Sequence, residues 1–472
     1  MTKTIATDLC IIGAGSGGLS LAAVATQLGV GTVLIERGRM GGDCLNYGCV
    51  PSKALIAAAR AAHGARAAAV FGVDAEPRVD FARVRRHIHD VIAEIAPHDS
   101  VERFAALGVR VVAADAEFIG PREVAAGDVR VVAKRYVIAT GSSPLVPSIP
   151  GLAESGYLTN ESIFDLTQLP AHLVVIGGGP IGIELGQAFR RLGAAVSIVE
   201  AGRVLPADEP EMAEQIATEL RREGIEVLEG ATVARVEGKA GNLRVTAMSA
   251  AGARTLTGSH VLVAAGRRAN LPRGLEAAGI AYDKTGIALD RALRTTNRRV
   301  FAIGDAAGGL KFTHFANYQA IGILQNVLLP FALPVKPRPI PWVTYAEPEL
   351  AHVGLTEAAA RGAGHAVNIL RWPFAENDRA KADRATAGHI KIVTDRRDRV
   401  LGVSILGAHA GELIVPWTMM IGARQRSHRL LRTVFPYPTY SEVSRRAAAS
   451  ALAPKLLSPA IRRWVRFLLR FI

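Results

Sequence analysis

The sequence predicts an α/β protein with two Rossmann-like dinucleotide-binding domains and a separate α+β domain towards its C-terminus. Two observations carry this prediction. A glycine-rich β-α-β pattern occurs twice, and a proline-rich stretch at 334–341 precedes a region in which strand-like and helical runs alternate. With 472 residues, 49% of them hydrophobic, the chain is long enough for about three domains with cores of their own.

The first β-α-β pattern lies near the start of the chain. We expect an apolar strand over 8–12, a helix of small residues over 19–28 and a second strand over 32–35 that ends at Glu36. Glycines between strand and helix permit a tight turn and the close approach of a pyrophosphate to the helix N-terminus, and the terminal acid can bind a ribose hydroxyl. The predicted dinucleotide-binding residues are Gly13, Gly15, Gly18 and Glu36.

The second pattern repeats the first. A strand is expected over 173–176, a helix that ends near Leu192 and a further strand over 196–199 that ends at Glu200. A carboxylate at this place favours the free ribose hydroxyls of NADH, because the 2′-phosphate of NADPH would face a like charge. Arg203 is close in sequence and weakens this preference. The predicted binding residues are Gly177, Gly179, Gly182 and Glu200.

The cysteines point to redox chemistry. Cys44 and Cys49 lie in the run Gly41-Gly-Asp-Cys-Leu-Asn-Tyr-Gly-Cys-Val-Pro-Ser-Lys53, and the third cysteine, Cys10, lies in an apolar run that predicts a buried strand. Two thiols five positions apart beside a dinucleotide-binding unit can close into a disulfide against a bound cofactor. A purely structural disulfide would add little stability through so small a loop. No second cysteine or histidine pair follows to complete a zinc site.

The formal net charge of +14 is concentrated near the C-terminus. Residues 421–472 contain ten arginines and one lysine against a single acid, Glu442. Such a local excess argues against a nucleic-acid-binding surface spread over the protein. The first strand begins close to Met1, and no apolar run reaches the roughly 20 residues that span a bilayer. We therefore expect a cytoplasmic protein without a signal peptide.

Residues 455–472 predict a basic amphipathic helix. At about 100° per residue, the apolar side chains fall on one side and the arginines on the other. Such a helix suits a peripheral membrane anchor. Alternatively, its apolar side packs on this protein or on a second copy, and both interpretations stay open. The apolar residues are Ile461, Trp464, Val465, Phe467, Leu468, Leu469, Phe471 and Ile472, and the arginines are Arg462, Arg463, Arg466 and Arg470.

Together these motifs resemble the FAD-dependent pyridine nucleotide-disulfide oxidoreductases, the group that includes dihydrolipoamide dehydrogenase, glutathione reductase and mercuric reductase. The resemblance covers nearly the whole chain, and the cysteine run is its most specific part. It rests on both glycine patterns, the cysteine run, Ala139-Thr-Gly141, Ala265-Gly-Arg267 and Ala302-Ile-Gly-Asp305.

The resemblance implies FAD on the first unit and a nicotinamide cofactor on the second, with NADPH less favoured than NADH. Electrons would pass from the nicotinamide through the flavin to the Cys44–Cys49 disulfide, and then to a disulfide or a metal ion. It also implies a homodimer in which the C-terminal domain of one subunit completes the site of the other. The implied domains are 1–150 with 270–338 for FAD, 151–269 for NAD(P), 339–455 for dimerisation and 456–472 for the basic helix.

The resemblance also assigns roles to residues of the site. Cys49 would face the flavin as a thiolate, and Cys44 would be the exposed thiol that meets the substrate. Lys53 would lie near the flavin ring and pair with Glu184. The remaining implied FAD contacts are Gly42, Thr140, Gly141, Gly304, Asp305 and His314, and Gly266 belongs to the implied NAD site.

One departure from the family pattern concerns the acceptor. Lipoamide and glutathione reductases have a histidine before Pro-Thr that bonds a later glutamate, whereas this chain has Tyr437 there and keeps Glu442. With a pKa of about 10, tyrosine is a poor base at neutral pH. The mercuric reductases also have Phe-Pro-Tyr, but they carry a pair of cysteines near the C-terminus that this chain lacks. We therefore expect a mercuric reductase-like or dihydrolipoamide dehydrogenase-like enzyme that lacks rapid exchange with lipoamide or glutathione.

Two other functions compete with this one. The amphipathic helix suggests a membrane-associated enzyme that passes electrons from NADH through flavin to a quinone or to oxygen. A third interpretation is a binding protein that has kept the fold and lost catalysis. Both cysteines, Lys53, Glu184 and both glycine patterns are present, which argues against this last interpretation.

Overall fold

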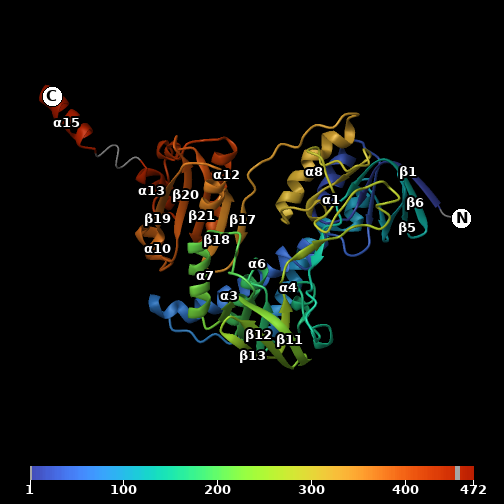
Figure 1. Cartoon of the computed structure of the whole chain (residues 1–472), viewed down its shortest axis with the longest axis horizontal. Helices are drawn as coiled ribbons and strands as arrows, with labels where there is room; N and C mark the ends of the chain where they lie inside the picture. The colour runs from blue at the N-terminus through green and yellow to red at the C-terminus, as the bar shows by residue number, and fades with distance from the viewer. Residues whose placement is uncertain (1–2, 452–457) are drawn as a thin grey trace. The chain divides into compact units, whose positions relative to one another are not determined.

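The structure, a computed structural model, describes residues 3–451 and 458–472. Packing divides the chain into two compact units, shown in Figure 1. The first contains Met1–Ala201 and Gly230–Pro337, and the second contains Gly202–Glu229 and Arg338–Ile472. Both units combine helices with sheets, which confirms the predicted α/β class.

The first unit is built on a seven-stranded sheet in the order β3-β2-β1-β6-β5-β4, with β16 also paired to β6. Strands β1, β2, β3, β6 and β16 run parallel, and β4 and β5 add an antiparallel edge. Strand β16 joins the sheet although it lies far from β6 in the sequence. The bounds are β1 (Lys3–Ile12), β2 (Thr32–Glu36), β3 (Arg110–Ala113), β4 (Ala116–Gly120), β5 (Glu123–Ala126), β6 (Val129–Ile138) and β16 (Val300–Ala302).

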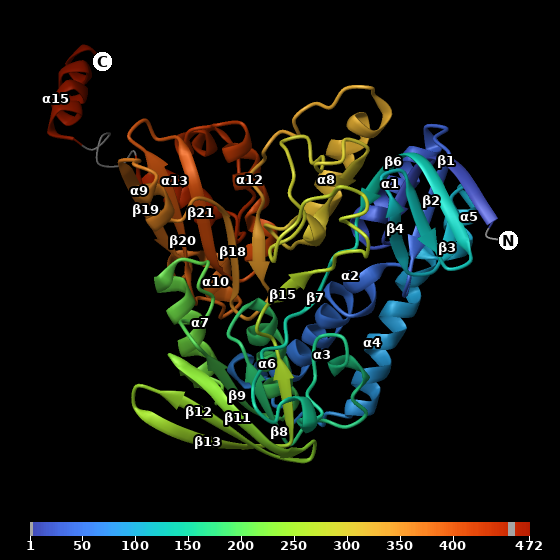
Figure 2. The ribbon, with the colours of Figure 1, turned by 45° about the vertical axis from the view of Figure 1, so that its right-hand side comes forward.

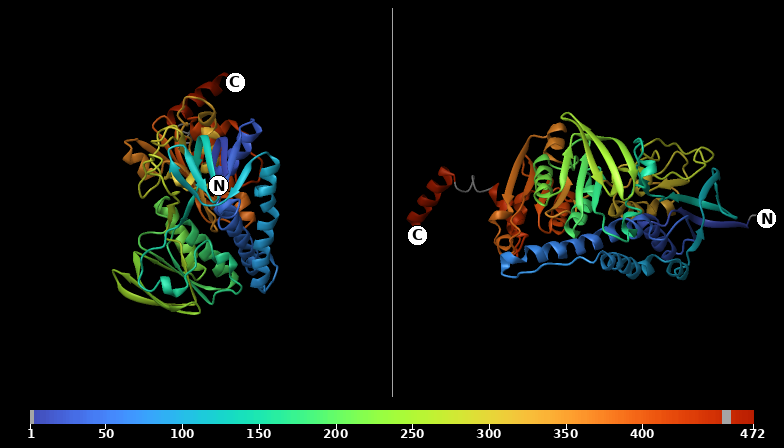
Figure 3. Two further views of the ribbon diagram at one scale, coloured as in Figure 1. Left: turned by 90° about the vertical axis from the view of Figure 1, so that its right-hand side faces the viewer. Right: turned by 90° about the horizontal axis from the view of Figure 1, so that it is seen from below.

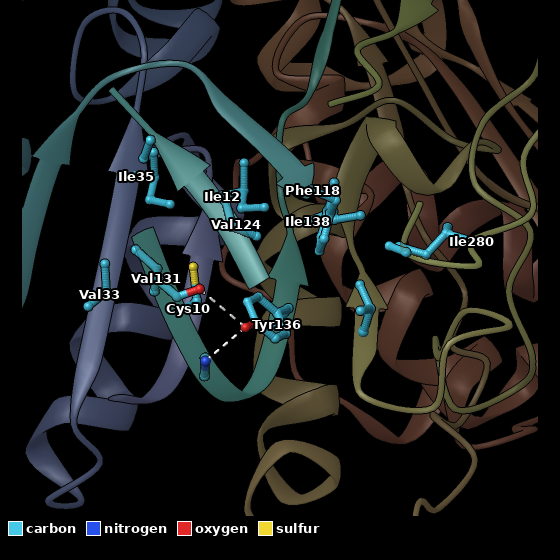
Figure 4. Close-up of a cluster of buried hydrophobic side chains, with 14 of the residues drawn as sticks. Cys10, Ile12, Val33, Ile35, Phe118, Val124, Val131, Tyr136, Ile138 and Ile280 are labelled. Carbon is cyan, nitrogen blue, oxygen red and sulfur yellow. Dashed lines mark hydrogen bonds between the residues drawn. The ribbon is translucent and has the colours of Figure 1, made fainter. Parts of the chain in front are cut away.

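Cys10 lies in the core of this sheet, as its apolar surroundings predicted (Figure 4). Its side chain is fully buried among aliphatic side chains from β1, β2 and β6. Tyr136 fills the same core, and its hydroxyl accepts a hydrogen bond from the amide of Ala133 at 2.8 Å. Burial raises the pKa of the Cys10 thiol. This cysteine therefore acts as a small hydrophobic side chain.

Helices of small residues cover the sheet. Alanines and glycines let α1 and α8 pack closely; a Cβ on Gly17 would lie 3.4 Å from the Cβ of Ala316. The long helices α3 and α4 also pack against each other, and both are blue in Figure 3. The bounds are α1 (Ser16–Gln27), α2 (Gly42–Asn46), α3 (Cys49–Ala67), α4 (Phe81–Ile95), α5 (Val101–Ala106) and α8 (Thr313–Leu328).

The first unit also contains the second β-α-β pattern. Strands β9, β8 and β14 form a parallel array, and α6 connects β8 to β9. A separate antiparallel sheet is formed by β11, β12 and β13, as Figure 2 shows, and β7 pairs with β15. The bounds are β7 (Ser142–Pro144), β8 (His172–Ile176), α6 (Pro180–Leu192), β9 (Ala195–Glu200), β11 (Ala231–Lys239), β12 (Asn242–Ser249), β13 (Gly252–Gly258), β14 (His260–Val263) and β15 (Arg267–Ala269).

The second unit centres on an antiparallel sheet in the order β17-β18-β21-β20-β19. Helix α12 packs on β18 and β21, and α13 packs on β19 and β20 (Figure 2). Trp417 is fully buried, and its indole N–H donates to Ser444 at 3.0 Å. The bounds are α7 (Pro210–Arg222), β10 (Glu226–Glu229), β17 (Trp342–Thr344), β18 (Glu349–Gly354), α9 (Glu357–Gly362), β19 (Val367–Pro373), α10 (Asp378–Ala382), β20 (His389–Asp395), β21 (Val400–Gly407), α11 (Ala410–Leu413), α12 (Val415–Gly422), α13 (Glu442–Ser450) and α15 (Pro459–Leu468).

The segment 202–229 differs from its predicted place. The sequence put it in an NAD(P)-binding domain over 151–269, whereas packing assigns it to the second unit. A buried lysine explains the assignment, because Lys391 of β20 bonds Glu209 at 2.8 Å and Glu211 at 2.6 Å. Ionic contacts of this kind hold the segment against the C-terminal sheet.

The predicted basic helix is present as α15, which begins at Pro459 and is capped by the Ser458 hydroxyl, which accepts a hydrogen bond from the amide of Ile461. Residues 452–457, the end of the predicted dimerisation domain and the start of the predicted helix, lie outside the described residues. Within the described ranges, none of the helices is long and apolar enough to cross a membrane.

Candidate active site

The turn between β1 and α1 requires its glycines. Gly13 has φ +104°, and a Cβ there would lie 2.4 Å from the carbonyl oxygen of Ala139. A Cβ on Gly18 would lie 1.9 Å from the carbonyl oxygen of Gly13. Gly15 directly precedes helix α1 and has no side chain to cap it, so the first N–H groups of the helix are left for other acceptors. This is the geometry of an anion site at a helix N-terminus.

The turn between β8 and α6 repeats this geometry. Gly177 has φ +114°, and a Cβ there would lie 2.4 Å from the carbonyl oxygen of Ala264. A Cβ on Gly182 would lie 2.0 Å from the carbonyl oxygen of Gly177. Beside Gly179, which precedes α6, the corresponding space is open to 4 Å. The second turn therefore also leaves room for a phosphate to approach the backbone N–H groups directly.

Each β-α-β pattern has an acid at the end of its second strand, Glu36 in the first pattern and Glu200 in the second, and these two acids hold equivalent positions. The Glu36 carboxylate accepts from the amide of Ala14 at 2.6 Å, and the Glu200 carboxylate accepts from the amide of Gly178 at 2.6 Å. Each carboxylate is fixed beside its own glycine turn, where a ribose-binding acid is expected. The two turns and their acids fit two dinucleotides.

A pair of alanine substitutions should separate the two dinucleotide sites. Gly18→Ala drives a methyl group into the carbonyl of Gly13, and Gly182→Ala does the same at Gly177. Overpacking a rigid contact costs about 1–3 kcal/mol. We expect Gly18→Ala to lower FAD occupancy, read from flavin absorbance, by about tenfold or more. We expect Gly182→Ala to keep FAD and raise the KM for NADH by a similar factor.

A matched control is Gly64→Ala in α3, where a new Cβ meets nothing within 4 Å and the backbone is helical. Helix propensity predicts unchanged or slightly higher stability for this variant. Equal loss of FAD in Gly18→Ala and Gly182→Ala would contradict separate sites.

The candidate redox residues lie where two helices meet. Cys44 belongs to the short helix α2, and Cys49 is the first residue of α3. The neighbouring Cys44 thiol, the Thr313 hydroxyl at 3.5 Å and the positive charge of Lys53 lower the pKa of Cys49 to about 6. The proximity of Cys49 and burial raise the pKa of Cys44. A helix N-terminus also favours a thiolate at Cys49.

In the protein chain alone, Cys49 is exposed and Cys44 is partly buried. The predicted roles of the two thiols towards flavin and substrate stay predictions. Thr313, the first residue of α8, was not among the predicted site residues. Its only sequence signal was its place between Lys311 and His314.

The pKa difference predicts selective alkylation of the reduced enzyme. Iodoacetamide should modify Cys49 with a midpoint near the pKa of about 6, because the thiolate fraction rises through that pH. Peptide mass spectrometry separates Cys49 from Cys44. The Cys44→Ala variant removes the neighbouring thiol that lowers the pKa of Cys49 and should raise the midpoint, and buried Cys10 should stay unmodified. Equal midpoints for Cys44 and Cys49 would contradict the assignment.

Lys53 and Glu184 form the expected ion pair. The Lys53 ammonium lies 2.8 Å from the Glu184 carboxylate, and Glu184 is buried in α6. Lys53 lies one helical turn after Cys49, so its charge also acts on the thiolate. Helices α3 and α6 pack together, and this ion pair joins the cysteine helix to the second dinucleotide unit.

A polar network missed by sequence reasoning joins the cysteine loop to Asp305. The Asp43 carboxylate accepts from Asn160 at 3.1 Å and pairs with Arg267 at 3.1 Å. Arg267 donates from Nε to the Ser142 hydroxyl at 2.8 Å, and that hydroxyl donates to Asp305 at 2.5 Å. Burial raises the pKa of Asp305. The sequence signals that could have indicated this network are Asp43 within the cysteine motif and Arg267 after Ala265-Gly266.

Other predicted FAD contacts lie around the same turns. A Cβ on Gly42, which has φ +59°, would lie 2.7 Å from the Cα of Gly15, so the cysteine loop and the first glycine turn touch through backbone. The Thr140 hydroxyl donates to the carbonyl of Asn270 at 2.5 Å. Gly141 has φ +69° and open space beside it.

The remaining predicted cofactor residues are placed as follows. The amide of Gly304 donates to Gln319 at 2.7 Å, which fixes the turn before Asp305. His314 is exposed, and its ring stacks on that of Phe312 with 5.3 Å between the ring centroids. Gly266 has φ +114° and precedes β15.

Tyr437 and Glu442 belong to the second unit. The Tyr437 side chain is 70% exposed, and its hydroxyl donates to Asp378 at 3.1 Å, which raises the pKa of Tyr437. Glu442 is buried and pairs with Arg445 at 3.3 Å. Tyr437 is therefore bonded to Asp378, whereas Glu442 is paired with Arg445 of its own helix, α13. A raised pKa makes Tyr437 a still weaker base at neutral pH.

Two glycine turns of the dinucleotide-binding kind, together with a thiol pair next to a lysine–glutamate ion pair, are the features of a flavin-dependent disulfide reductase. The chain belongs to the pyridine nucleotide-disulphide oxidoreductase family, whose pattern matches residues 7–320, and the family's dimerisation domain matches residues 340–448. The enzyme is an NAD(P)H-dependent flavoprotein disulfide oxidoreductase, and the family implies FAD and NAD(P)H as its cofactors. The dimerisation domain supports a homodimer.

Its relatives are named for different acceptors. The chain is 36% identical over 451 residues to a mercuric reductase of Streptomyces lividans, covering 93% of this chain and 95% of that one. It is 35% identical over 464 residues to a dihydrolipoyl dehydrogenase of Geobacillus stearothermophilus, covering 95% and 97%. A solved structure of the HOCl-induced flavoprotein disulfide reductase RclA from Escherichia coli has a TM-score of 0.84 and 28% identity, covering 94% and 99%.

Proposed function

We propose that this enzyme uses NADH to reduce a Cys44–Cys49 disulfide and passes the two electrons to a metal ion or a small disulfide. The observation that carries the proposal is the placement of Cys44 in α2 and Cys49 at the start of α3, one helical turn before Lys53, whose ammonium pairs with the buried Glu184 at 2.8 Å. Bound FAD would supply two-electron transfer between the nicotinamide and the cysteine pair. Cys49 is held as a thiolate, and Cys44 carries a proton that it would release to water as its sulfur bonds the acceptor.

Among acceptors, we favour a soft metal ion that reaches the cysteine pair directly. Exchange with a dithiol needs a base near neutral pH, and Tyr437 with its raised pKa is poorly suited to that step. A soft ion needs only thiolates as ligands. The name mercuric reductase for one relative and a Cu(II) complex of RclA are consistent with this class. The proposed transfer uses the Cys44–Cys49 pair alone, and the printed sequence has no cysteine after Cys49.

NADH is the proposed electron donor. The Glu200 carboxylate lies at the second glycine turn, where it would oppose a 2′-phosphate. The guanidinium of Arg203 donates to the carbonyls of Pro206 and Asp208, both at 3.2 Å. These bonds hold Arg203 in its own loop, which supports the preference for NADH.

The proposed domains keep the boundaries predicted from sequence, although the segment 202–229 within the proposed NADH domain packs with the second unit. FAD would bind to residues 1–150 and 270–338, NADH to 151–269, and the subunits would meet through 339–455. We further propose a cytoplasmic location, where free thiols stay reduced. The family and its named relatives do not favour the alternative in which electrons pass to a quinone or to oxygen.

Anaerobic titration with NADH tests the proposal. The flavoprotein should take up about four electrons, two for the flavin and two for the cysteine pair. Hg(II) or Cu(II) should then reoxidise it rapidly, and lipoamide slowly. A Cys44→Ser/Cys49→Ser variant should take up two electrons. Uptake of two electrons by the unmodified enzyme, with reoxidation by a quinone alone, would overturn the proposed function.

A further inference from the structure

The C-terminal helix α15 and the 3-10 turn that follows it, Leu469–Phe471, together have a sharply divided surface. Residues 461–472 comprise eight apolar side chains and four arginines, with no other residue type. At about 100° per residue, the arginines share a narrow arc and the apolar side chains occupy the rest. The large apolar side chains are exposed, including Trp464 at 61%, Phe467 at 52% and Phe471 at 74%. Aromatic side chains with this exposure mark a docking surface.

The charge of the segment selects the kind of partner. Between residues 421 and 472 there are eleven basic residues and one acid, Glu442, which is already paired with Arg445. A second copy of the helix would bring four more arginines and no acid to offset them. An anionic membrane surface offers both partners, because its headgroups offset the positive charge of the arginines and its acyl chains bury the apolar arc. The matched dimerisation domain ends at residue 448, before the helix begins.

We propose that α15 docks flat on an anionic phospholipid surface. The apolar arc with Trp464 and Phe467 enters the boundary between headgroups and acyl chains, and the arginine arc contacts lipid phosphates. The ten-residue helix lies in the interface, because a span needs about 20 apolar residues. This contact is independent of the proposed electron acceptor and brings the reductase to the membrane surface.

Vesicle sedimentation of the FAD-loaded, full-length enzyme tests the proposal. The protein should pellet with vesicles of equal parts phosphatidylcholine and phosphatidylserine and stay in the supernatant with phosphatidylcholine alone. Each arginine near an anionic leaflet strengthens binding about fivefold. Arg463→Gln/Arg466→Gln should therefore weaken binding about 25-fold. Trp464→Ser/Phe467→Ser should abolish it.

The matched control is Arg78→Gln/Arg86→Gln, which removes two exposed arginines from the first unit. It should bind vesicles like the unmodified enzyme, and all variants should keep their flavin absorbance and NADH oxidation. Failure of the unmodified enzyme to pellet with phosphatidylserine would overturn the proposal. Tail variants that change the oligomeric mass by light scattering, with vesicle binding unaltered, would instead assign the helix to contact with a second copy.

Discussion

A Cys49→Ser variant is expected to reduce a metal ion or a disulfide at least about 10³-fold more slowly than the unmodified enzyme, because the disulfide can no longer form. Serine keeps the size of the side chain and the start of α3, and its hydroxyl is not ionised near pH 6, where Cys49 is. The measurement is kcat with NADH and saturating Hg(II) or a small disulfide. Flavin content should be unchanged.

Two controls separate loss of the relay from loss of the fold. Reduction of ferricyanide by NADH bypasses the cysteines and should persist in Cys49→Ser. The Cys10→Ala variant changes a buried cysteine of β1 and should keep full activity with each acceptor. Undiminished turnover in Cys49→Ser would mean that electrons leave from the flavin and that the thiol pair has no part in catalysis.

The β-α-β units and the cysteine motif could be predicted because their physics is local. A glycine pattern between a buried strand and a helix fixes its turn through contacts within a few residues. In the structure, Gly13 and Gly177 have nearly equal φ values, and a Cβ on either would meet a carbonyl oxygen at the same 2.4 Å. The Lys53 ion pair with Glu184 was accessible only through family resemblance, because the two residues lie on different helices.

The polar network and the buried lysine could not be predicted from the sequence. Asp43, Arg267 and Asp305 lie on three distant segments, and only tertiary packing brings them to a shared set of hydrogen bonds. Lys391 alternates with isoleucines along β20, a pattern that predicts a solvent-facing lysine. Acids from α9 and from the segment before β10 surround it instead, and their approach has no sequence signal.

Lys391 is a deeply buried lysine of the second unit, and it lies in a cluster of three glutamates. It is 1% exposed, and its ammonium lies 2.8 Å from Glu209, 2.6 Å from Glu211 and 2.9 Å from Glu357. Glu209 is also buried and accepts from the amide of Glu357 at 2.8 Å. The lysine therefore compensates a carboxylate that has little access to water.

Lys391→Met is expected to destabilise the second unit by about 3–5 kcal/mol, because it leaves the buried Glu209 charge without its cation. Native-state hydrogen exchange measures this locally. Protection of the β20 amides, residues 389–395, should fall by about two to three orders of magnitude. Peptides from β1 and β6 in the first unit should keep their protection. Lys381→Met is the matched control, since its lysine is exposed and lies 3.8 Å from Asp378, and such pairs contribute about 0–1 kcal/mol.

The double variant Lys391→Met/Glu209→Gln identifies the cause of that loss. Glutamine keeps an oxygen that can accept the Glu357 amide and removes the charge that Lys391 compensates. If an uncompensated charge destabilises Lys391→Met, the double variant should recover much of the lost protection despite carrying one more substitution. Additive losses would instead mean that the long lysine side chain matters for packing, because removing the carboxylate would then give no relief.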